Sequence, residues 1–505
     1  MKIIPTLILA GMLVALAATA RAEVRLNSIF CDGMVLQCDL AANIWGTASP
    51  GENVIIEFAG QKKSATADAN GKWLVKLDPL KVSAEPRELK AGSIVIRDVL
   101  VGEVWLCSGQ SNMEWALGRS TGGLVAVTNS TNPLLRLCTI PHNSQMTPQE
   151  NVTTKWVQSG PEVTKNFSAI AWWFGSKLQK ELGVPVGIIN DSFGGTTIQS
   201  WMPLESLRKG PWPQDKSTDI ALAKADYDQR KAKLQPAMDK YLAEKATAMK
   251  NKIPVPDFPA GWPGDFRGPS VLWNGMVAPL LKFSIHGVLW YQGESNAYVG
   301  VADTYKLLLP ALIAEWRAGF AQPDLPFIIY QISPNRKPQT DPNENSGIAV
   351  LQEAQLKTSL ATPLSALVVT MDLGETNVHY LNKEPAGERG MKAALGLAYG
   401  RKIEFSSPVF KSVRFDGDKA IIQFHYAGGG LIAKGVSLSG FVIAGEDRKF
   451  AFAEAQVEGD AVIVSSPQVS KPVAVRYGWA DFPKVNLFNK EGLPASPFRT
   501  DDWLK

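Results

Sequence analysis

The segment Gly102–Glu114, GEVWLCSGQSNME, is the part of the sequence best suited to covalent chemistry. A short buried strand is predicted by Val99, Val101, Val104, Trp105 and Leu106, and Ser108–Gly109 ends it in a turn of small residues. Ser111 would then lie past the carboxyl end of the strand, where open α/β sheets place reacting groups. A serine there can attack an acyl group if a base reaches its hydroxyl and donors surround the oxyanion. For an isolated serine, capping the next helix is the alternative role.

Three further segments repeat the pattern of an apolar strand followed by a turn of small, polar or amide residues. They are Val184–Asn190 before Asp191–Thr197, Ile285–Tyr291 before Gln292–Asn296, and Ala366–Met371 before Asp372–His379. Parallel strands of one sheet bring their carboxyl ends to the same edge. We therefore expect a serine, glycine N–H groups, a side-chain amide and a histidine to converge, and this set suits acyl transfer.

These four blocks resemble those of SGNH hydrolases, and more closely those of the sialate O-acetylesterase family. The resemblance rests on GQSNM (109–113), NDSFGGT (190–196), WYQGESNA (290–297) and the late histidine, and extends from DGMVLQ (32–37) to GLPASPFRTD (492–501). It implies an α/β fold with a parallel sheet flanked by helices. It also implies a serine esterase that removes O-acetyl groups from sugars, such as sialic acid or plant polysaccharides, through an acetyl-enzyme and without a cofactor. A carbohydrate-binding relative with weak or lost esterase activity is the alternative.

The general base must be one of four histidines. His142 lies in a polar loop, His286 begins a strand and suits a structural role, and His425 ends a strand in the C-terminal region. His379 follows a strand and a glycine-containing turn, and it coincides with the catalytic histidine of the family. We expect His379 to take the Ser111 proton during attack and to return it to the sugar alkoxide.

The oxyanion hole is expected to use the backbone N–H groups of Ser111 and Gly195 and the side-chain amide of Gln292. Gln292 lies nearer the strand end than Asn296 and matches the QGE motif of the family. Gly194 is the alternative to Gly195, one residue away. Contacts with the substrate are assigned to Gln110, Asn112 and Glu294.

The residue that orients the histidine departs from the family pattern. SGNH enzymes commonly carry an aspartate three residues before the histidine, where this sequence has Thr376. Close relatives show Asp-Ile-His, where it has Asn377–Val378–His379. An asparagine can accept the imidazole N–H but supplies no charge to stabilise the imidazolium. Three cases stay open: a Ser–His dyad, a substitute acid in Glu375 or Asp372, or a catalytically weakened relative.

Length and composition predict an exported protein of several domains. The chain has 505 residues, 45% of them hydrophobic and 20% charged, which is typical of globular proteins but long for a single core. Residues 1–22 combine a charged start, an apolar run and an A-x-A site, which predicts a secretory signal and a periplasmic or extracellular location. We expect a β module at 23–97, the catalytic domain at 98–402 with a helical insertion at about 215–268, and a second β module at 403–505; both modules should be β-sandwich-like.

Composition also argues against several classes of partner. A net charge of +4 with no basic run argues against nucleic acid, and no stretch after the signal is long and apolar enough to span a bilayer. No C-x-x-C or H-x-x-x-H spacing suggests a metal. The oligomeric state is open, and so is the pairing of the four cysteines, Cys31, Cys38, Cys107 and Cys138.

Overall fold

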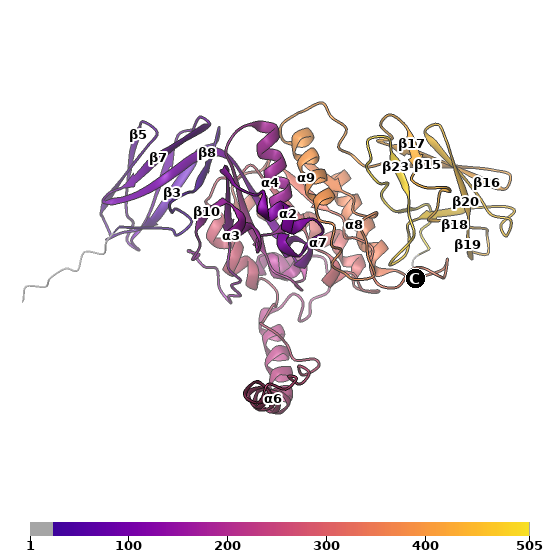
Figure 1. The fold of residues 1–505 in the computed structure, drawn as a ribbon, viewed down its shortest axis with the longest axis horizontal. Helices are drawn as coiled ribbons and strands as arrows, with labels where there is room; N and C mark the ends of the chain where they lie inside the picture. The colour runs from indigo at the N-terminus through magenta and orange to yellow at the C-terminus, as the bar shows by residue number, and fades with distance from the viewer. Residues whose placement is uncertain (1–23, 504–505) are drawn as a thin grey trace, which may run out of the picture.

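The computed structural model describes residues 24–503. Figure 1 shows an elongated molecule with a β module at each end and an α/β domain between them. The secretory signal expected at residues 1–22 lies outside the described residues. Within residues 24–503, no helix combines the length and the apolar character needed to cross a membrane.

The N-terminal module consists of two small β-sheets around an apolar core. In β6, Trp73, Val75 and Leu77 are buried and alternate with exposed residues, as expected for a strand with one face on a core. The first sheet has the order β1-β3-β6, and the second is built from β2, β4, β5, β7 and the start of β8. The strands preceding β8 are β1 (Arg25–Leu26), β2 (Val35–Gln37), β3 (Ala42–Thr47), β4 (Asn53–Phe58), β5 (Gln61–Thr66), β6 (Lys72–Leu77) and β7 (Ser83–Ala91).

Strand β8 (Ile94–Gly109) connects this module directly to the turn that carries Ser111. Its first half pairs with β7 in antiparallel fashion, and its second half lies parallel to strands of the central sheet. The domain boundary expected between residues 97 and 98 therefore falls inside one continuous strand. Residues 99–109 are all buried, so the strand that leads to Ser111 is held within the core on both faces.

The central sheet has the strand order β10-β9-β11-β8-β12-β13-β14. Neighbours from β9 to β14 are parallel, and β10 is antiparallel at one edge. Gly109 is opposite Ser192 of β11 and Tyr291 of β12, so three strands end at the same level. The bounds are β9 (Asn132–Thr139), β10 (Trp156–Ser159), β11 (Val186–Ser192), β12 (Gly287–Tyr291), β13 (Phe327–Tyr330) and β14 (Ser365–Val368).

Helices cover the central sheet, with α4 packed against α9 and α7 packed against α8. Every residue of β11, β12 and β13 is buried, as expected for parallel strands covered on both faces. The amphipathic spacing of apolar residues at 166–182 predicts one of these helices, α4, which Ser168 caps at its N-terminus and Gly183 ends with φ +68°. The helices are α1 (Ser111–Glu114), α2 (Gly123–Thr128), α3 (Pro161–Thr164), α4 (Ala169–Leu182), α5 (Leu204–Lys209), α6 (Ile220–Asn251), α7 (Tyr305–Gly319), α8 (Gly347–Ala361) and α9 (Glu384–Leu397).

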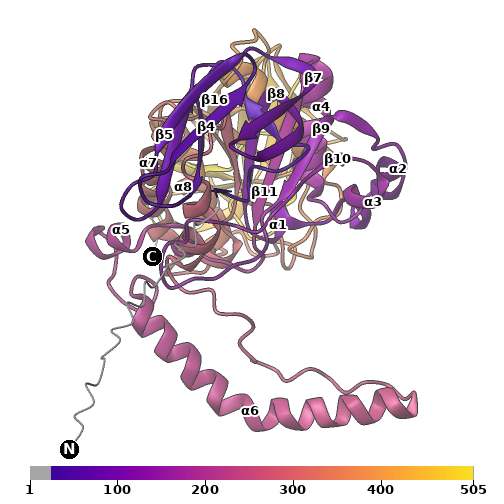
Figure 2. The ribbon, with the colours of Figure 1, turned by 90° about the vertical axis from the view of Figure 1, so that its left-hand side faces the viewer.

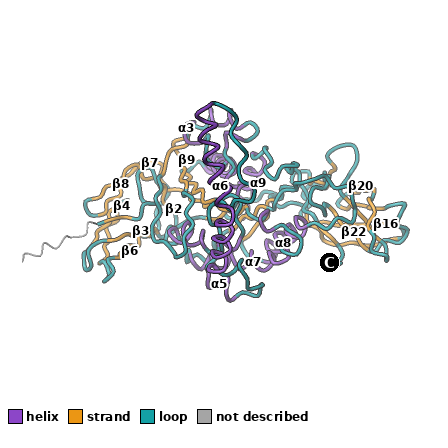
Figure 3. Tube along the Cα trace, turned by 90° about the horizontal axis from the view of Figure 1, so that it is seen from below, coloured by secondary structure: helices purple, strands orange, loops and turns teal. Residues whose placement is uncertain are grey.

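Helix α6 forms an arm that projects from the α/β domain (Figures 1 and 2). A proline inside a helical pattern predicts a break at Gln235–Pro236 and a helical pair, but α6 is one helix of 32 residues with Pro236 inside it. The helix bends midway (Figure 2), because a proline removes one backbone hydrogen bond and crowds the preceding turn. Residues 252–269 then run back beside the helix (Figure 2). Seen from below, the arm lies over the α/β domain and not over either β module (Figure 3).

The C-terminal module has its own apolar core between two four-stranded sheets. One sheet has the order β15-β16-β21-β20 and the other β19-β18-β22-β24, while β17 pairs with β23. Its strands are β15 (Val409–Asp416), β16 (Lys419–His425), β17 (Leu431–Ala433), β18 (Phe441–Ala444), β19 (Phe450–Phe452), β20 (Glu454–Glu458), β21 (Ala461–Ser465), β22 (Ala474–Tyr477), β23 (Leu487–Asn489) and β24 (Phe498–Arg499).

Candidate active site

A pocket of about 500 Å³ contains residues from all four strand-and-turn segments. The coincident ends of β8, β11 and β12 bring three of the turns to one edge of the sheet, and the loop after β14 supplies the fourth. The pocket is lined by Gln110, Ser111, Gly194, Gly195, Glu294, Ser295, Ala297, Tyr298, Asn335, Arg336, Ile348, Val378 and His379.

Ser111 is the first residue of α1, so its N–H has no acceptor within the helix. The glycine turn after β11 lies directly against it, since a Cβ on Gly194 would come within 3.1 Å of the Ser111 Cβ. The Gly194 N–H donates to Glu114 Oε2 at 2.6 Å. The Gly195 N–H has no acceptor among residues 24–503. Of the two glycines, Gly195 is therefore the one whose N–H is available to a ligand.

Gly195→Ala should lower kcat by about a hundredfold. Gly195 has φ +71°, which strains an alanine, and an added Cβ would lie 2.7 Å from Arg267 Nη1. Relieving this contact shifts the N–H, and losing one oxyanion donor costs about a hundred- to a thousandfold. Gly183→Ala is the matched control, because Gly183 has φ +68° but no atom of residues 24–503 lies within 4 Å of its added Cβ. Similar rates for the two variants on a chromogenic acetate ester would contradict the assignment.

Gln292 does not line the pocket, contrary to its expected place in the oxyanion hole. Its side chain is fully buried, and Nε2 lies 3.1 Å from Gln110 Oε1, 3.0 Å from the Thr196 carbonyl oxygen and 2.9 Å from Asn296 Oδ1. Its Oε1 accepts from the Tyr305 hydroxyl at 2.9 Å. An amide nitrogen has two hydrogens, so these internal acceptors leave none for a substrate. Gln292 instead holds the first three turns together.

Asn296, the alternative donor, is also engaged inside the protein. Its Oδ1 accepts from Gln292 and from the Ile198 N–H, and its Nδ2 donates to Gln199 Oε1 at 3.0 Å. The side chain is buried and lies outside the pocket lining. Neither amide of the third turn therefore presents a donor to the pocket.

Gln110 supplies the free amide donor that neither Gln292 nor Asn296 of the third turn offers to the pocket. Its Oε1 accepts from Gln292 Nε2 at 3.1 Å, from the Gly293 N–H at 3.2 Å and from the Ser295 N–H at 3.3 Å. These three donors hold the oxygen toward the third turn. Its Nε2 has no acceptor among the described residues, and Gln110 lines the pocket next to Ser111. Gln110 can therefore offer an amide N–H to a ligand in the pocket.

The His379 ring is held by stacking. It lies 4.8 Å from the Trp115 ring with an interplanar angle of 28°, and the Arg119 guanidinium is 4.2 Å from the same tryptophan ring. Burial lowers the pKa of His379, and the positive charges of Lys383 and Arg119 lower it further. The ring makes no hydrogen bond within residues 24–503, so the expected direct bond to Ser111 Oγ is not formed in this structure.

None of the three residues considered for orienting the histidine contacts its ring. Arg389 binds both carboxylate oxygens of Asp372 at 2.7 Å. Glu375 Oε1 accepts a backbone N–H of its own loop at 2.8 Å. Asn377 Oδ1 accepts the backbone N–H of His379 at 2.9 Å. Each side chain has a different partner, so the structure offers no substitute acid from this set.

Asn112 lies behind the pocket, where it bridges three of the turns. It is fully buried and is absent from the pocket lining, contrary to its expected contact with the substrate. Its Nδ2 donates to Glu294 Oε1 at 2.5 Å and to the Val378 carbonyl oxygen at 3.1 Å, and its Oδ1 accepts from Lys383 Nζ. Burial lowers the pKa of Lys383 to about 7 and raises the pKa of Glu294. Glu294 itself lines the pocket.

The C-terminal module supports one wall of the pocket, which the sequence pattern did not indicate. Asp481 Oδ2 pairs with Arg336 Nη1 at 2.6 Å, and the Asp481 carbonyl oxygen accepts the Asn335 N–H at 3.0 Å. Arg336 Nη2 also donates to the Ala297 carbonyl oxygen at 3.1 Å. The two bonds to Asp481 join residues more than a hundred positions apart, so no local motif signals them.

Within residues 24–503, no group of three or more histidine, cysteine, aspartate or glutamate side chains is placed to hold a metal ion. The four cysteines are free thiols. Burial raises the pKa of Cys107, which keeps this thiol protonated near neutrality.

The sequence matches known carbohydrate esterases. The profile of the family described as carbohydrate esterase, sialic acid-specific acetylesterase, matches residues 101–223 and 271–395. Identity to the sialate O-acetylesterase of Pongo abelii is 26%, over 94% of this chain and 92% of that protein. Identity to the sialate O-acetylesterase of Homo sapiens is 28%, over 80% of this chain and 76% of that protein.

A solved structure agrees with these sequence matches. A carbohydrate acetylesterase from Xanthomonas citri superimposes with a TM-score of 0.80 at 34% identity, over 95% of this chain and 100% of that chain. The chain therefore belongs to the sialic acid-specific acetylesterase family of carbohydrate esterases. It is an enzyme of the carbohydrate O-acetylesterase class.

Proposed function

We propose that this protein removes acetyl groups from sugar hydroxyls by a serine-dependent mechanism with an acetyl-enzyme intermediate, on an SGNH-hydrolase-like fold. The observation that carries the proposal is the pocket in which Ser111, the Gly195 N–H, the Gln110 amide and His379 come together. Family membership supports acetylated sugars as the substrate class. Acetylated sialic acid, xylan and pectic sugars are the substrates to compare.

In the proposed reaction, Ser111 Oγ attacks the carbonyl carbon of the acetyl ester while His379 accepts the hydroxyl proton. The N–H groups of Ser111 and Gly195 and the Nε2 of Gln110 stabilise the resulting oxyanion. When the intermediate collapses, the C–O bond to the sugar breaks and the sugar oxygen takes the proton from His379. A water molecule, deprotonated by His379, then attacks the acetyl-serine. The bond between the acetyl carbon and Ser111 Oγ breaks, acetate leaves, and Ser111 Oγ takes the proton back from His379.

The described contacts favour a Ser–His dyad among the three cases left open by the sequence. The lowered pKa of His379 keeps its imidazole neutral at pH 7, the state that a general base requires. Stacking on Trp115 restrains the ring plane, which is one task of the usual acid. Catalytic hydrogen bonds are often long before substrate binds, so the His379–Ser111 bond is expected to form in the complex.

The proposal is tested with a chromogenic acetate ester and with acetylated sialic acid, xylan and pectin. We expect acetate release from at least one sugar substrate, and mass spectrometry of a rapidly quenched reaction should find one acetyl group on Ser111. Hydrolysis of the chromogenic ester without acetate release from any sugar would contradict the substrate class. Binding of acetylated sugars without any hydrolysis would instead support the carbohydrate-binding alternative.

We also propose that the enzyme is exported, on the strength of the sequence of residues 1–22. Cleavage after Ala22 would give a mature chain that begins at Glu23. Amino-terminal sequencing of the protein from the periplasm or medium of expressing cells tests this expectation. An uncleaved chain confined to the cytoplasm would contradict it.

Asn377→Asp should shift the acid limb of the pH–rate profile upward. The pKa of His379 is lowered, so in the wild type kcat/KM should fall with acidification only below the ordinary value of about 6.5. A carboxylate at position 377 would stabilise the protonated imidazole and raise this pKa. In the variant, acidification would then protonate His379 at a higher pH than in the wild type. At alkaline pH the neutral imidazole acts in both proteins, so kcat there should stay within about twofold.

Asn377→Ala is the control, because it removes the bond to the His379 N–H without adding charge. Complete pH–rate profiles of the three proteins decide between charge and geometry. An acid limb at the same pH in Asn377→Asp and Asn377→Ala would contradict the predicted electrostatic effect.

A further inference from the structure

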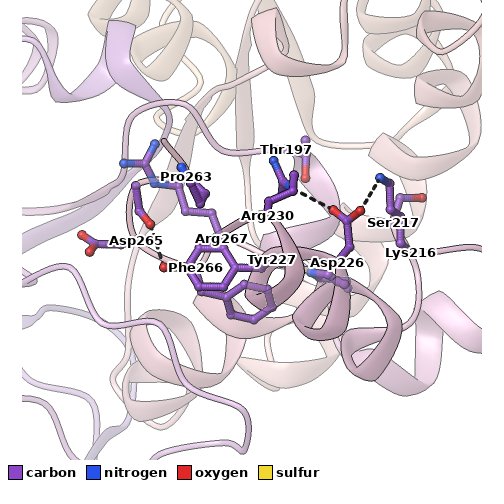
Figure 4. A pocket seen from close by; sticks show the side chains of 14 residues that line it. Thr197, Lys216, Ser217, Asp226, Tyr227, Arg230, Pro263, Asp265, Phe266 and Arg267 are labelled. Atoms are coloured by element: carbon purple, nitrogen blue, oxygen red, sulfur yellow. Dashed lines mark hydrogen bonds and ion pairs between the residues drawn. The ribbon is translucent and has the colours of Figure 1, made fainter. Parts of the chain in front are cut away.

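A second cavity, of about 440 Å³, lies at the base of the α6 arm. Tyr227 of α6 and Phe266 of the return segment contribute two aromatic rings, 5.4 Å apart and at 65° to each other. Figure 4 shows the two rings side by side among charged side chains. Tyr227 Oη donates to the Gly264 carbonyl oxygen at 2.8 Å, which anchors the return segment to the helix.

Charged groups surround these rings with both donors and acceptors. Asp226 accepts from Lys216 Nζ at 3.2 Å and from Arg230 Nε at 3.1 Å, as the dashed lines of Figure 4 show. Asp265 and Arg267 also line the cavity. Apolar faces combined with a few oriented polar groups are the usual design of a small-molecule site. A sugar ring matches this combination, because it offers C–H faces to aromatic rings and hydroxyls to carboxylates and guanidinium groups.

The cavity is connected to the glycine turn of the active site. Arg267, which lines it, donates from Nη1 to the Gly194 carbonyl oxygen at 2.8 Å. Thr197 lines the cavity too, and Gly195, two residues earlier, lines the pocket of Ser111. Two residues span at most about 7 Å of extended chain. The two cavities therefore adjoin one short turn, against which the Arg267 side chain packs, and their spacing suits a ligand longer than one sugar ring.

We propose that this cavity is a distal subsite for a second glycosyl unit of an acetylated oligosaccharide whose ester lies at Ser111. The inference rests on the proposed function and adds a preference for extended substrates over single sugars. Most of α6 and its return segment fall between the two parts of the family profile, residues 101–223 and 271–395. The subsite is thus built largely from a segment outside the matched family core.

The test compares kcat/KM on 4-nitrophenyl acetate, on an acetylated monosaccharide and on the corresponding trisaccharide. The matched probes are O-acetylated sialic acid with O-acetylated sialyllactose, and acetylated xylose with acetylated xylotriose. In the series that the enzyme hydrolyses, kcat/KM of the wild type should be about tenfold higher for the trisaccharide than for the monosaccharide. A ratio of this size is what one additional favourable contact with the substrate provides. Tyr227→Ala and Arg230→Gln should each remove most of this preference and leave 4-nitrophenyl acetate hydrolysis within about twofold.

Tyr241→Ala is the matched control, because Tyr241 pairs with Phe258 at 5.3 Å farther along the same arm, outside the cavity. It should keep the trisaccharide preference. Equal rates on mono- and trisaccharide in the wild type, or an unchanged preference in both cavity variants, would overturn the proposal. Failure to hydrolyse any sugar acetate would instead overturn the proposed function. Arg230→Gln keeps the test valid if Tyr227→Ala fails to fold, because the Arg230 side chain is more than half exposed and its replacement should leave the fold intact.

Discussion

Ser111→Ala should abolish hydrolysis of both chromogenic and sugar acetates, with kcat falling at least about ten-thousandfold. Removing the nucleophile of a serine hydrolase leaves only the rate that the oxyanion hole and substrate binding give to water. The fold should be unaffected, because the hydroxyl makes no hydrogen bond among residues 24–503 and lines an open pocket. Steady-state rates and thermal melting of the purified variant check both parts.

Ser176→Ala provides a matched serine variant outside the pocket. Ser176 lies on α4 and donates only to the Trp173 carbonyl of its own helix, so its loss should leave kcat within about twofold. If Ser111→Ala kept more than about one per cent of the wild-type rate, another group would be the nucleophile. A remaining rate of that size far exceeds the rate that an oxyanion hole alone supports.

Gln110→Glu should lower kcat by about a hundred- to a thousandfold with little change in KM. A carboxylate keeps an acceptor for the Gly293 and Ser295 N–H groups, but it replaces the free amide N–H with an acceptor. The lost donor acts on charge that develops in the transition state, so the effect falls on kcat. The negative charge next to the oxyanion adds to the loss.

Gln292→Ala distinguishes this assignment from the one that the QGE motif predicted. Because Gln292 is a buried residue with bonds to Gln110, Thr196 and Asn296, its loss should lower the melting temperature by several degrees, as expected for breaking a buried hydrogen-bond network. Gln110→Glu should melt closer to the wild type. A stable Gln292→Ala protein with a large loss of kcat, beside an active Gln110→Glu protein, would return the oxyanion role to Gln292.

Much of the framework of the active site is local in the sequence. Apolar runs of five to eight residues followed by small or amide residues predicted strands β8, β11, β12 and β14 and the turns that follow them. A parallel sheet aligns such strand ends by its hydrogen-bond register, so the convergence of four turns at one pocket follows from pattern alone. The choice of Ser111 and His379 as candidate residues needed no contact information.

The direction in which each amide points was decided by tertiary contacts. Gln110 and Gln292 are similar in sequence, since each ends a strand and precedes a small residue. Their roles separate because Gln292 meets three acceptors while Gln110 receives three donors on its oxygen. These partners come from other turns, so side-chain orientation could not be read from either motif.

The same reason explains the other differences. Asp372 and Glu375 lie close to His379 in sequence, but their carboxylates have other partners. Arg389 binds Asp372, and a backbone N–H donates to Glu375. A proline inside a helical pattern predicts that the helix ends, but α6 continues through Pro236 as one bent helix. The sequence determined which residues could carry the chemistry and where the strands end, because those properties depend on residues adjacent in the chain. Only the tertiary structure decided which polar groups remain unpaired and face the pocket, because their competing partners lie far away along the chain.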